Sequence, residues 1–576
     1  MNSHVQSSER KTEALSPFSF SYFTRNWWGV PGFLLLIFVF LLPVCRLVWL
    51  SVSNGEEVGL MLYQEILLEK ATWRTIQNTI IITISSTVLS LVIGVGLAFT
   101  MAYVNIRAKK WLQLLIFLPF LIPSYISTLA WVQFFGGNGP IQFLFNESVN
   151  LYSMGGIIFV LGLSHYPLVY LMSVEVFRRI PRELKYAAST SGASGGVVFR
   201  KVILPMALPG IASGGILAFL SNIDNFGIPA FLGIPANIRV LSTYIYEQII
   251  GYGPSAFSRA AVLSVILGVI ALIGTVVQWA IIRKSNVSET TARDTEPRYY
   301  LTRGWRNVAE SALWIFLLLT TLVPLIVMAS TSFIRAYGLS LSWENLSLKN
   351  YRYLLFEDAK TGSAIGNSVT LALATMLICM VIGTVIAYIR FKKPSFFVKA
   401  SEIIVTIPYA LPGTVFALAI ILMWLQPLPG VQPGVYGTIW ILLIAYITRF
   451  TVLQMRGSLT AFSQIDPSME EAARTSGARA YVKWKSILFP LLMPGVLSGA
   501  ALVFLTALTE LTVSSLLWSS GSETIGVVIF SFEQAGYSTY STAFSTLIVT
   551  AVLTMGILFV LFEKIWKKRV MKSDSN

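Results

Sequence analysis

The residues with the clearest pattern in this chain form a polar loop between two long apolar stretches. The loop opens with Asp466 and Pro467, continues with acidic residues, and ends its first part at Gly477. An aspartate before a proline, with acids in the next turn, is typical of a helix start, and a glycine is typical of a helix end. At helical spacing the small residues of this segment share one face, which can seat closely against another protein. The chemistry indicated is docking, and we assign no catalytic residue.

The same pattern occurs once more, in the first half of the chain. The second-half copy reads Glu471, Ala472, Ala473, three residues, Gly477, nine residues, and Ile487-Leu488-Phe489-Pro490. The first-half copy has Tyr186, Ala187, Ala188 and Gly192, and it ends at Val202-Ile203-Leu204-Pro205. Both copies resemble the hallmark loop of permease subunits of type I binding-protein-dependent ABC importers, E-A-A, three residues, G, nine residues, I-x-L-P. Tyr186 departs from that glutamate, and Glu183, one turn earlier, is the alternative acid.

The resemblance implies that each loop forms a coupling helix that docks on a separate ATP-binding subunit, present in two copies, with an extracytoplasmic solute-binding protein as third partner. The expected coupling residues are Glu183, Tyr186, Ala187, Ala188, Gly192, Glu471, Ala472, Ala473 and Gly477. The chain has no G-x-x-x-x-G-K-[ST] motif, the phosphate-binding loop of many ATPases. We therefore expect no cofactor in this chain, no enzymatic activity of its own, and ATP with Mg bound by the partner ATPase.

Two pairs of glycines follow the loops, each pair four residues apart in an apolar stretch. They are Gly210 and Gly214 in the first half, and Gly495 and Gly499 in the second. Small residues at this spacing let helices in a membrane approach closely. The duplication favours helix packing over coincidence.

Acidic residues inside apolar stretches are candidates for the translocation path or its gate. Asp224 and Asn225 open a segment that resembles the D-F-G-x-P-x-L-G-like segment of ferric-iron permeases, with Asn225 inserted after the aspartate. Glu510 opens the matching segment of the second half, which is similar to a segment common in type I permeases. The alternative is that these side chains cap a broken helix. For Arg46 and His165 a structural role is the favoured interpretation.

The composition of the chain indicates which kind of secondary structure positions these residues. Of 576 residues, 55% are hydrophobic and only 12% are charged, and the mean hydropathy is +0.70. A membrane helix needs about 20 apolar residues. Twelve apolar stretches meet that need, so we predict an all-α polytopic membrane protein. The stretches are 30–52, 76–104, 111–136, 154–177, 203–231, 261–282, 307–333, 364–389, 400–425, 435–456, 491–518 and 541–563.

The distribution of basic residues predicts the orientation. With a cytoplasmic N-terminus, 33 of the 42 Lys and Arg residues fall in cytoplasmic segments and eight in outer loops. Cytoplasmic loops carry such an excess, so both termini are expected in the cytoplasm of a bacterial inner membrane protein. The net charge of +15 then reflects membrane orientation and needs no nucleic-acid partner. The first stretch is read as an uncleaved anchor, with a signal peptide as the alternative. Two cysteines and two histidines offer no metal centre.

The two halves of the chain repeat each other. Asn78, Gly94 and Pro123 match Asn367, Gly383 and Pro412, each 289 residues later, and after the loops the offset is 285. Six spans in each half give two parallel repeats, with the path expected between them. The predicted parts are a tail (1–29), an anchor helix with an outer loop (30–71), the first permease domain (72–283), a linker (284–306), an extra helix with an outer loop (307–361), the second permease domain (362–563) and a tail (564–576).

Fusion of two such halves in one chain resembles the ferric-iron and thiamine branches of the family. Together with the segment that opens at Asp224, it favours iron(III) as substrate. Thiamine, phosphonate, sugar-phosphate and polyamine stay open as substrates. From a different class, an ion-coupled secondary transporter also has twelve spans in two repeats, but it does not need the paired loops.

Overall fold

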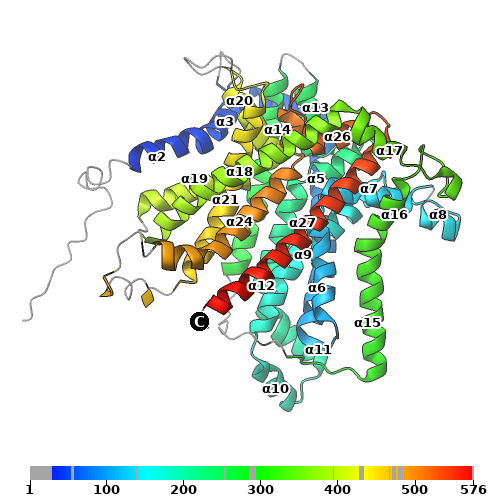
Figure 1. The fold of residues 1–576 in the computed structure, drawn as a ribbon, viewed down its shortest axis with the longest axis vertical. Helices are drawn as coiled ribbons and strands as arrows, with labels where there is room; N and C mark the ends of the chain where they lie inside the picture. The colour runs from blue at the N-terminus through cyan, green and yellow to red at the C-terminus, as the bar shows by residue number, and fades with distance from the viewer. Residues whose placement is uncertain are drawn as a thin grey trace, which may run out of the picture. The chain divides into compact units, whose positions relative to one another are not determined.

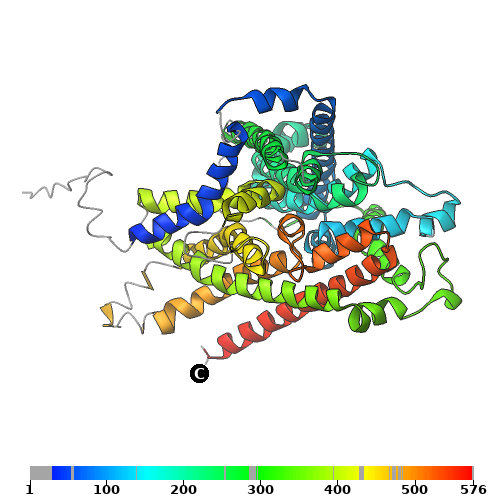
Figure 2. The same ribbon diagram turned by 90° about the horizontal axis from the view of Figure 1, so that it is seen from above.

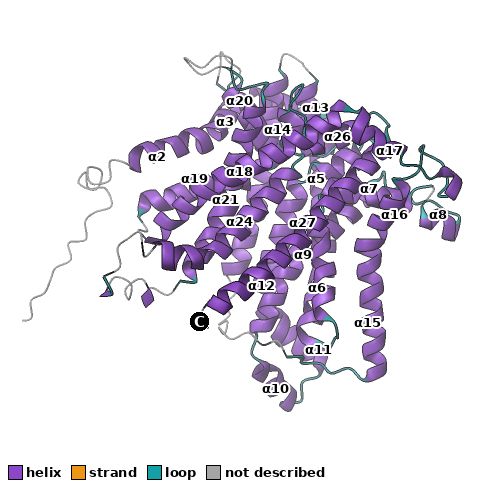
Figure 3. Cartoon of the chain, viewed as in Figure 1, coloured by secondary structure: helices purple, strands orange, loops and turns teal. Residues whose placement is uncertain are grey.

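The described part of the computed structural model is helical, and three isolated bridges are its only β-type contacts (Figure 3). The prediction of an all-α protein is confirmed for this part of the chain. The described residues are 29–53, 58–137, 139–251, 255–283, 294, 296–392, 395–426, 434–465, 468–469, 475–477, 482 and 484–573.

The described residues contain ten helices that are long and apolar enough to cross a membrane, or twelve if each of two bent pairs counts as one span. The third and ninth apolar stretches were expected as single helices, and this is wrong in detail. The third is α6 (Lys109–Leu121) followed by α7 (Ser124–Phe135), and the chain bends by 105° between Lys109–Leu121 and the segment Ser124–Phe145. The ninth is α19 (Phe396–Ala410) followed by α20 (Gly413–Trp424). Each break falls at a matched proline, Pro123 or Pro412, because the residue before a proline is driven into extended backbone.

The chain forms two compact units. The first comprises residues 1–44, 377–410 and 448–502, and the second comprises residues 45–376, 411–447 and 503–576. Besides α19, the first unit contains α2 (Gly29–Leu36), and four helices contribute residues to both units. These four are α3 (Leu42–Val52), α18 (Ala359–Lys392), α21 (Ile439–Ser463) and α24 (Phe489–Leu508). The core of the first unit gathers Phe40, Ala387, Val405 and Phe462.

The second unit holds the first repeat complete. Its remaining helices are α4 (Met61–Leu68), α5 (Lys70–Tyr103), α8 (Pro140–Phe145), α9 (Met154–Arg179), α10 (Arg182–Thr190), α11 (Gly195–Val198), α12 (Leu204–Asp224), α13 (Leu241–Ile250), α14 (Ala256–Arg283), α15 (Arg303–Leu317), α16 (Val323–Thr331), α17 (Lys349–Arg352), α25 (Ser514–Leu517), α26 (Ile525–Gln534) and α27 (Ser538–Ser573). Short π-helical segments continue several of them. α26 and α27 lie side by side, orange-red and red in Figures 1 and 2.

Helix α9 is the centre of the first repeat and packs against both α5 and α12 (Figure 1). Glycine makes the close approach to α5 possible. A Cβ on Gly94 would lie 2.6 Å from Cβ of Val169, and one on Gly162 would lie 2.5 Å from Cδ2 of Leu89. Both distances are shorter than atoms tolerate. The side chains around this contact, including Tyr166 and Phe177, are fully buried.

Matched residues at the start of α5 and within α18 hold a short helix in each repeat. The amide of Asn78 donates to the carbonyl of Arg239 at 3.0 Å, and Thr79 Oγ1 accepts from the N–H of Leu241, the first residue of α13, at 2.8 Å. In the second repeat Asn367 donates to the carbonyls of Gly521 and Glu523, and Ser368 Oγ accepts from Ile525, the first residue of α26. The sequence repeat is therefore also a repeat of side-chain contacts, and in both copies a hydroxyl satisfies an orphan helix N–H.

Candidate coupling surface and translocation site

The first candidate coupling loop contains helix α10, which starts after an extended residue, Pro181. Its side chains divide by helical spacing. Glu183, Leu184, Tyr186 and Ala187 are exposed, and Tyr186 keeps 54% of its surface accessible. This helix is not among the candidate membrane spans, so its exposed leucine and tyrosine side chains form a partly apolar surface of the kind that a protein partner can cover.

The two alanines of this loop point in different directions. Ala188 is half-buried and packs against the core that contains α5 and α9, whereas Ala187 is exposed. The sequence predicted both as contact residues for the ATPase. In the structure Ala188 packs α10 against the rest of its own chain, and Ala187 lies on the exposed face with Glu183.

Gly192 ends α10 with a left-handed backbone. Its φ is +81°, the N–H of Gly192 donates to the carbonyl of Ser189, and the N–H of Ala193 donates to the carbonyl of Ala188, both at 3.0 Å. This is a Schellman motif, in which a glycine satisfies the last carbonyls of a helix. Gly477, its repeat partner, has a φ of +73°. Both glycines thus have the left-handed backbone that is typical of a glycine at a helix end, the role predicted for Gly477.

Most of the motif in the second loop lies outside the described residues. Glu471, Ala472 and Ala473 lie outside the described residues, as do Asp466 and Pro467. Their docking role stays a prediction, and so does the substitution of Glu183 for the missing glutamate at Tyr186.

The paired glycines lie where helices approach each other. A Cβ on Gly210 would lie 2.4 Å from Cγ2 of Val176, and one on Gly214 would lie 2.8 Å from Cα of Val169, so α12 meets α9 through both. In the first unit, a Cβ on Gly495 would lie 2.5 Å from Cβ of Ala461, and one on Gly499 would lie 3.1 Å from the Gln454 amide. There α24 meets α21 in the same way.

Asp224 and Asn225 lie where α12 stops. The carboxylate of Asp224 accepts a hydrogen bond from the N–H of Gly413, the first residue of α20. The amide of Asn225 donates to Ser124 Oγ, at the start of α7, at 3.0 Å, and its oxygen accepts from the N–H of Ile228 at 2.9 Å. This pair of residues therefore joins a helix start in each repeat.

Glu510 follows the end of α24 and caps the next short helix. Its carboxylate accepts from the N–H of Val513 at 2.9 Å, and from the N–H and hydroxyl of Ser514 at 3.0 and 2.8 Å. Ser514 Oγ also lies 2.6 Å from the hydroxyl of Tyr446. These contacts are those of a helix cap, the alternative that the sequence left open for this residue.

Two other polar groups in the spans have partners. Arg46 donates to the carbonyl of Met423 at 3.3 Å. His165 Nδ1 lies 2.7 Å from Asn222 Oδ1, and the amide of Asn222 donates to Thr87 Oγ1 at 3.1 Å. Asn222 was not predicted as part of this network, although an asparagine within an apolar stretch is itself a signal of buried hydrogen bonds.

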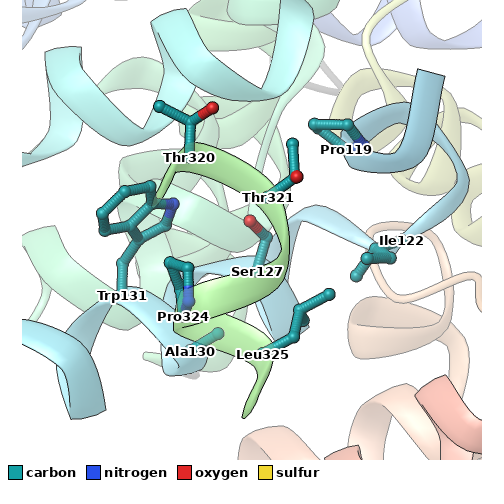
Figure 4. Close-up of a pocket in the computed structure, with 9 residues that line it drawn as sticks. All are labelled: Pro119, Ile122, Ser127, Ala130, Trp131, Thr320, Thr321, Pro324 and Leu325. Carbon is teal, nitrogen blue, oxygen red and sulfur yellow. The ribbon is translucent and has the colours of Figure 1, made fainter. Parts of the chain in front are cut away.

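A small pocket lies between the bent pair α6–α7 and the additional span α15–α16 (Figure 4). Ser127, Trp131, Thr320 and Thr321 line it together with prolines of both elements. None of the candidate path residues lines this pocket. Within the described ranges, no three His, Cys, Asp or Glu side chains lie close enough together to hold a metal ion.

Comparison with known proteins places the chain in a family. The model of the family "Binding-protein-dependent transport system inner membrane component" matches residues 90–285 and 379–572, once in each repeat. The Fe(3+)-transport system permease protein FbpB 2 of Haemophilus influenzae is 23% identical over 535 residues, which cover 92% of this chain and 97% of that protein. The ferric transport system permease protein FbpB of Actinobacillus pleuropneumoniae is also 23% identical, over 94% of this chain and 78% of that protein.

Shorter relatives match one part of the chain. The putrescine transport system permease protein PotI of Escherichia coli is 28% identical over 237 residues, 40% of this chain and 82% of that protein. A solved bacterial alginate ABC transporter chain has a TM-score of 0.38 and 15% identity over 47% of this chain and 99% of its own. Two family matches, at the positions of the two sequence repeats, confirm the fused permease architecture. The chain belongs to the binding-protein-dependent transport system inner membrane components and is the permease component of an ABC importer.

Proposed function

We propose that this permease imports iron(III), delivered by an extracytoplasmic binding protein and driven by two copies of a separate ATPase. The observation that supports the substrate is the similarity to ferric permeases along nearly the whole chain, with 97% of one such relative covered. Both family matches lie in one chain, so two permease halves are fused here. This fusion also supports iron(III) as the substrate.

We place the ATPase on the cytoplasmic loops, against α10 in the first half and the segment around Gly477 in the second. The exposed face of α10 with Glu183, Tyr186 and Ala187 supports this placement, since it is apolar in part and lies outside the spans. The excess of basic residues on the same side supports cytoplasmic termini.

The substrate path is proposed near Asp224 and Asn225, with Glu510 in the matching place of the second repeat. Iron(III) is a hard cation that prefers oxygen ligands, and these side chains offer carboxylate and amide oxygens. A tight site would trap a trivalent ion, so we propose a weak electrostatic guide. Of the three, Asp224 is the stronger candidate, because its carboxylate bridges the two repeats while Glu510 caps its own segment.

The test is uptake of labelled iron(III) into proteoliposomes that contain the permease, its ATPase and its binding protein. We expect ATP-dependent uptake of labelled iron(III) that saturates as the concentration of iron(III) rises. Unlabelled putrescine should not compete with this uptake. The polyamine relatives make putrescine the second candidate substrate. Uptake of labelled putrescine without uptake of iron(III) would overturn the iron assignment and leave the importer architecture intact.

A further inference from the structure

The end of the predicted linker folds back onto the first candidate coupling helix. We call residues 294 and 296–301 the strap. Its backbone is fixed at both sides: the N–H of Asp294 donates to the carbonyl of Arg178 at 2.8 Å, and those of Arg298 and Tyr299 donate to the carbonyl of Tyr103 at 2.7 and 2.9 Å. These carbonyls lie at the ends of α9 and α5. Sequence composition predicted only a hydrophilic connection here.

Arg298 is the buried anchor of the strap, and only 6% of its surface is exposed. Its guanidinium donates to the hydroxyl of Tyr103 at 3.2 Å and to the carbonyl of Ile180, and lies 3.6 Å from the carboxylate of Asp294. It also covers the Tyr103 ring, 4.3 Å from its centre. A buried charge is tolerated only when its donors are satisfied, so this set of contacts holds the strap in one position.

The carbonyl that Arg298 binds belongs to a hinge. Only Ile180 and Pro181 separate α9 from α10, and both have extended backbone, with ψ of 125° and 136°. The direction of α10 therefore depends on these two residues. The free carbonyl at the end of α9 is satisfied by the strap instead of by another turn of helix.

The strap also contacts the first two turns of α10. Arg182 pairs with Glu296 at 2.7 Å and with Asp294 at 3.1 Å. Lys185 donates to the carbonyl of Arg298 and lies 3.9 Å from the centre of the Tyr299 ring. Burial, and then repulsion from Arg298, lowers the pKa of Lys185. Lys185 and Ala188 are three residues apart and both partly buried, so they share one side of α10, and the strap leaves Ala187 on the exposed face.

We propose that the strap positions the first coupling helix for docking on the ATPase, and that Arg298 is the positioning residue that fixes the hinge at Ile180. The proposal rests on the docking role given to α10 above. Loss of Arg298 then changes how α10 meets its partner without touching the docking face itself.

The experiment is a cross-link between α10 and the copurified ATPase in proteoliposomes. Ala187→Cys, on the exposed face, supplies the reactive thiol in a chain with Cys45→Ser and Cys379→Ala. A reagent with a maleimide at one end and a succinimidyl ester at the other adds to this thiol and acylates a lysine amine of the ATPase, releasing N-hydroxysuccinimide. We expect Arg298→Ala to lower the cross-link severalfold and to lower ATPase stimulation by the binding protein, while Arg298→Lys retains part of both. Arg303→Ala is the matched control, because Arg303 is exposed at the start of α15 and carries the same charge.

Two outcomes separate this proposal from the docking role. If the parent Ala187→Cys chain gives no cross-link, docking through α10 fails. If the parent cross-links and Arg298→Ala does so equally, with unchanged stimulation, the strap is not a positioning element and docking stands. Should Arg298→Ala fail to accumulate, Arg182→Glu gives the second measurement: we expect a weaker cross-link that Glu296→Arg restores in part, and an unchanged cross-link overturns the proposal.

Discussion

The carboxylate of Asp224 accepts a hydrogen bond from the backbone N–H of Gly413, so the last residue of α12 in the first repeat caps α20 in the second. The next residue, Asn225, reaches Ser124 at the start of α7. Ser124 and Gly413 are repeat partners, 289 residues apart. Two consecutive residues at the end of α12 therefore contact matched positions, one in each repeat.

We expect Asp224→Asn to lower uptake of labelled iron(III) severalfold while stimulation of the ATPase is kept. The asparagine oxygen can still accept from Gly413, so the contact between the repeats survives while the negative charge is lost. Asp224→Ala removes both and is expected to lower the amount of folded protein too. Wild-type uptake by Asp224→Asn would show that the residue is a cap and not a guide.

Glu510→Gln is expected to lower thermal stability by about 1 kcal/mol, the usual contribution of a helix cap. Both carboxylate oxygens of Glu510 accept hydrogen bonds, from Val513 and from Ser514, and an amide has one acceptor oxygen. Unfolding of the purified permease in detergent measures this effect. Glu147→Gln, at an exposed position, is the control, and lost uptake at unchanged stability would instead assign Glu510 to the path.

Replacing a matched glycine that has left-handed backbone by arginine is expected to impair coupling more than replacing it by asparagine. Gly192 and Gly477 have φ of +81° and +73°, and a Cβ at either position meets no atom within 4 Å. Asparagine tolerates this backbone, whereas arginine adds strain and a long side chain at the proposed docking surface. We expect Gly477→Arg to abolish ATPase stimulation by the binding protein and Gly477→Asn to keep most of it. Equal stimulation in both variants, at matched expression, would contradict docking here.

The two loops are expected to contribute unequally. Tyr186 stands where the second repeat has Glu471. An exposed ion pair at a docking surface contributes about 0–1 kcal/mol, and a buried one more. Glu471→Ala should therefore impair coupling more than Tyr186→Ala, measured as transport at matched protein levels. An equal loss in both would show that the difference between the loops has no functional effect.

Neighbouring glycines of α12 provide a matched test of helix packing. A Cβ on Gly214 would lie 2.8 Å from backbone of Val169, whereas one on Gly215 would lie 3.2 Å from the end of the Leu91 side chain. Backbone cannot move aside as a side chain can, so Gly214→Ala should cost about 1–3 kcal/mol and Gly215→Ala clearly less. Thermal unfolding of the two variants compares them directly. The opposite order would mean that α12 and α9 do not approach as closely as described.

The apolar stretches and the repeat were predictable because each depends on local composition and on matched glycines and prolines. The positive φ of Gly477 follows from the helix-end pattern that precedes it. The break within the third and ninth stretches was missed, although Pro123 and Pro412 were recognised as matched. Hydropathy does not report direction, and a bent pair of helices is as apolar as a straight one.

The contacts of Arg298 and Asp224 were not predictable from the sequence. Arg298 binds Tyr103, 195 residues earlier, and Asp224 binds Gly413, 189 residues later. No periodicity or motif connects positions so far apart. Within a hydrophilic linker, the sequence around an arginine that becomes buried looks the same as the sequence around one that stays solvated. Only the structure shows that Arg298 is buried and Arg303 is exposed.

The strap has a consequence for the evolution of this chain. In a dimer of identical half-length permeases, both coupling helices have the same flanking sequence, and every mutation changes both at once. Fusion makes the stretch before α15 unique to one junction, so residues 294 and 296–301 can support α10 alone. Each loop is then free to change by itself. The tyrosine at 186, where the other copy keeps Glu471, is the kind of divergence that such a fused gene permits and a homodimer forbids.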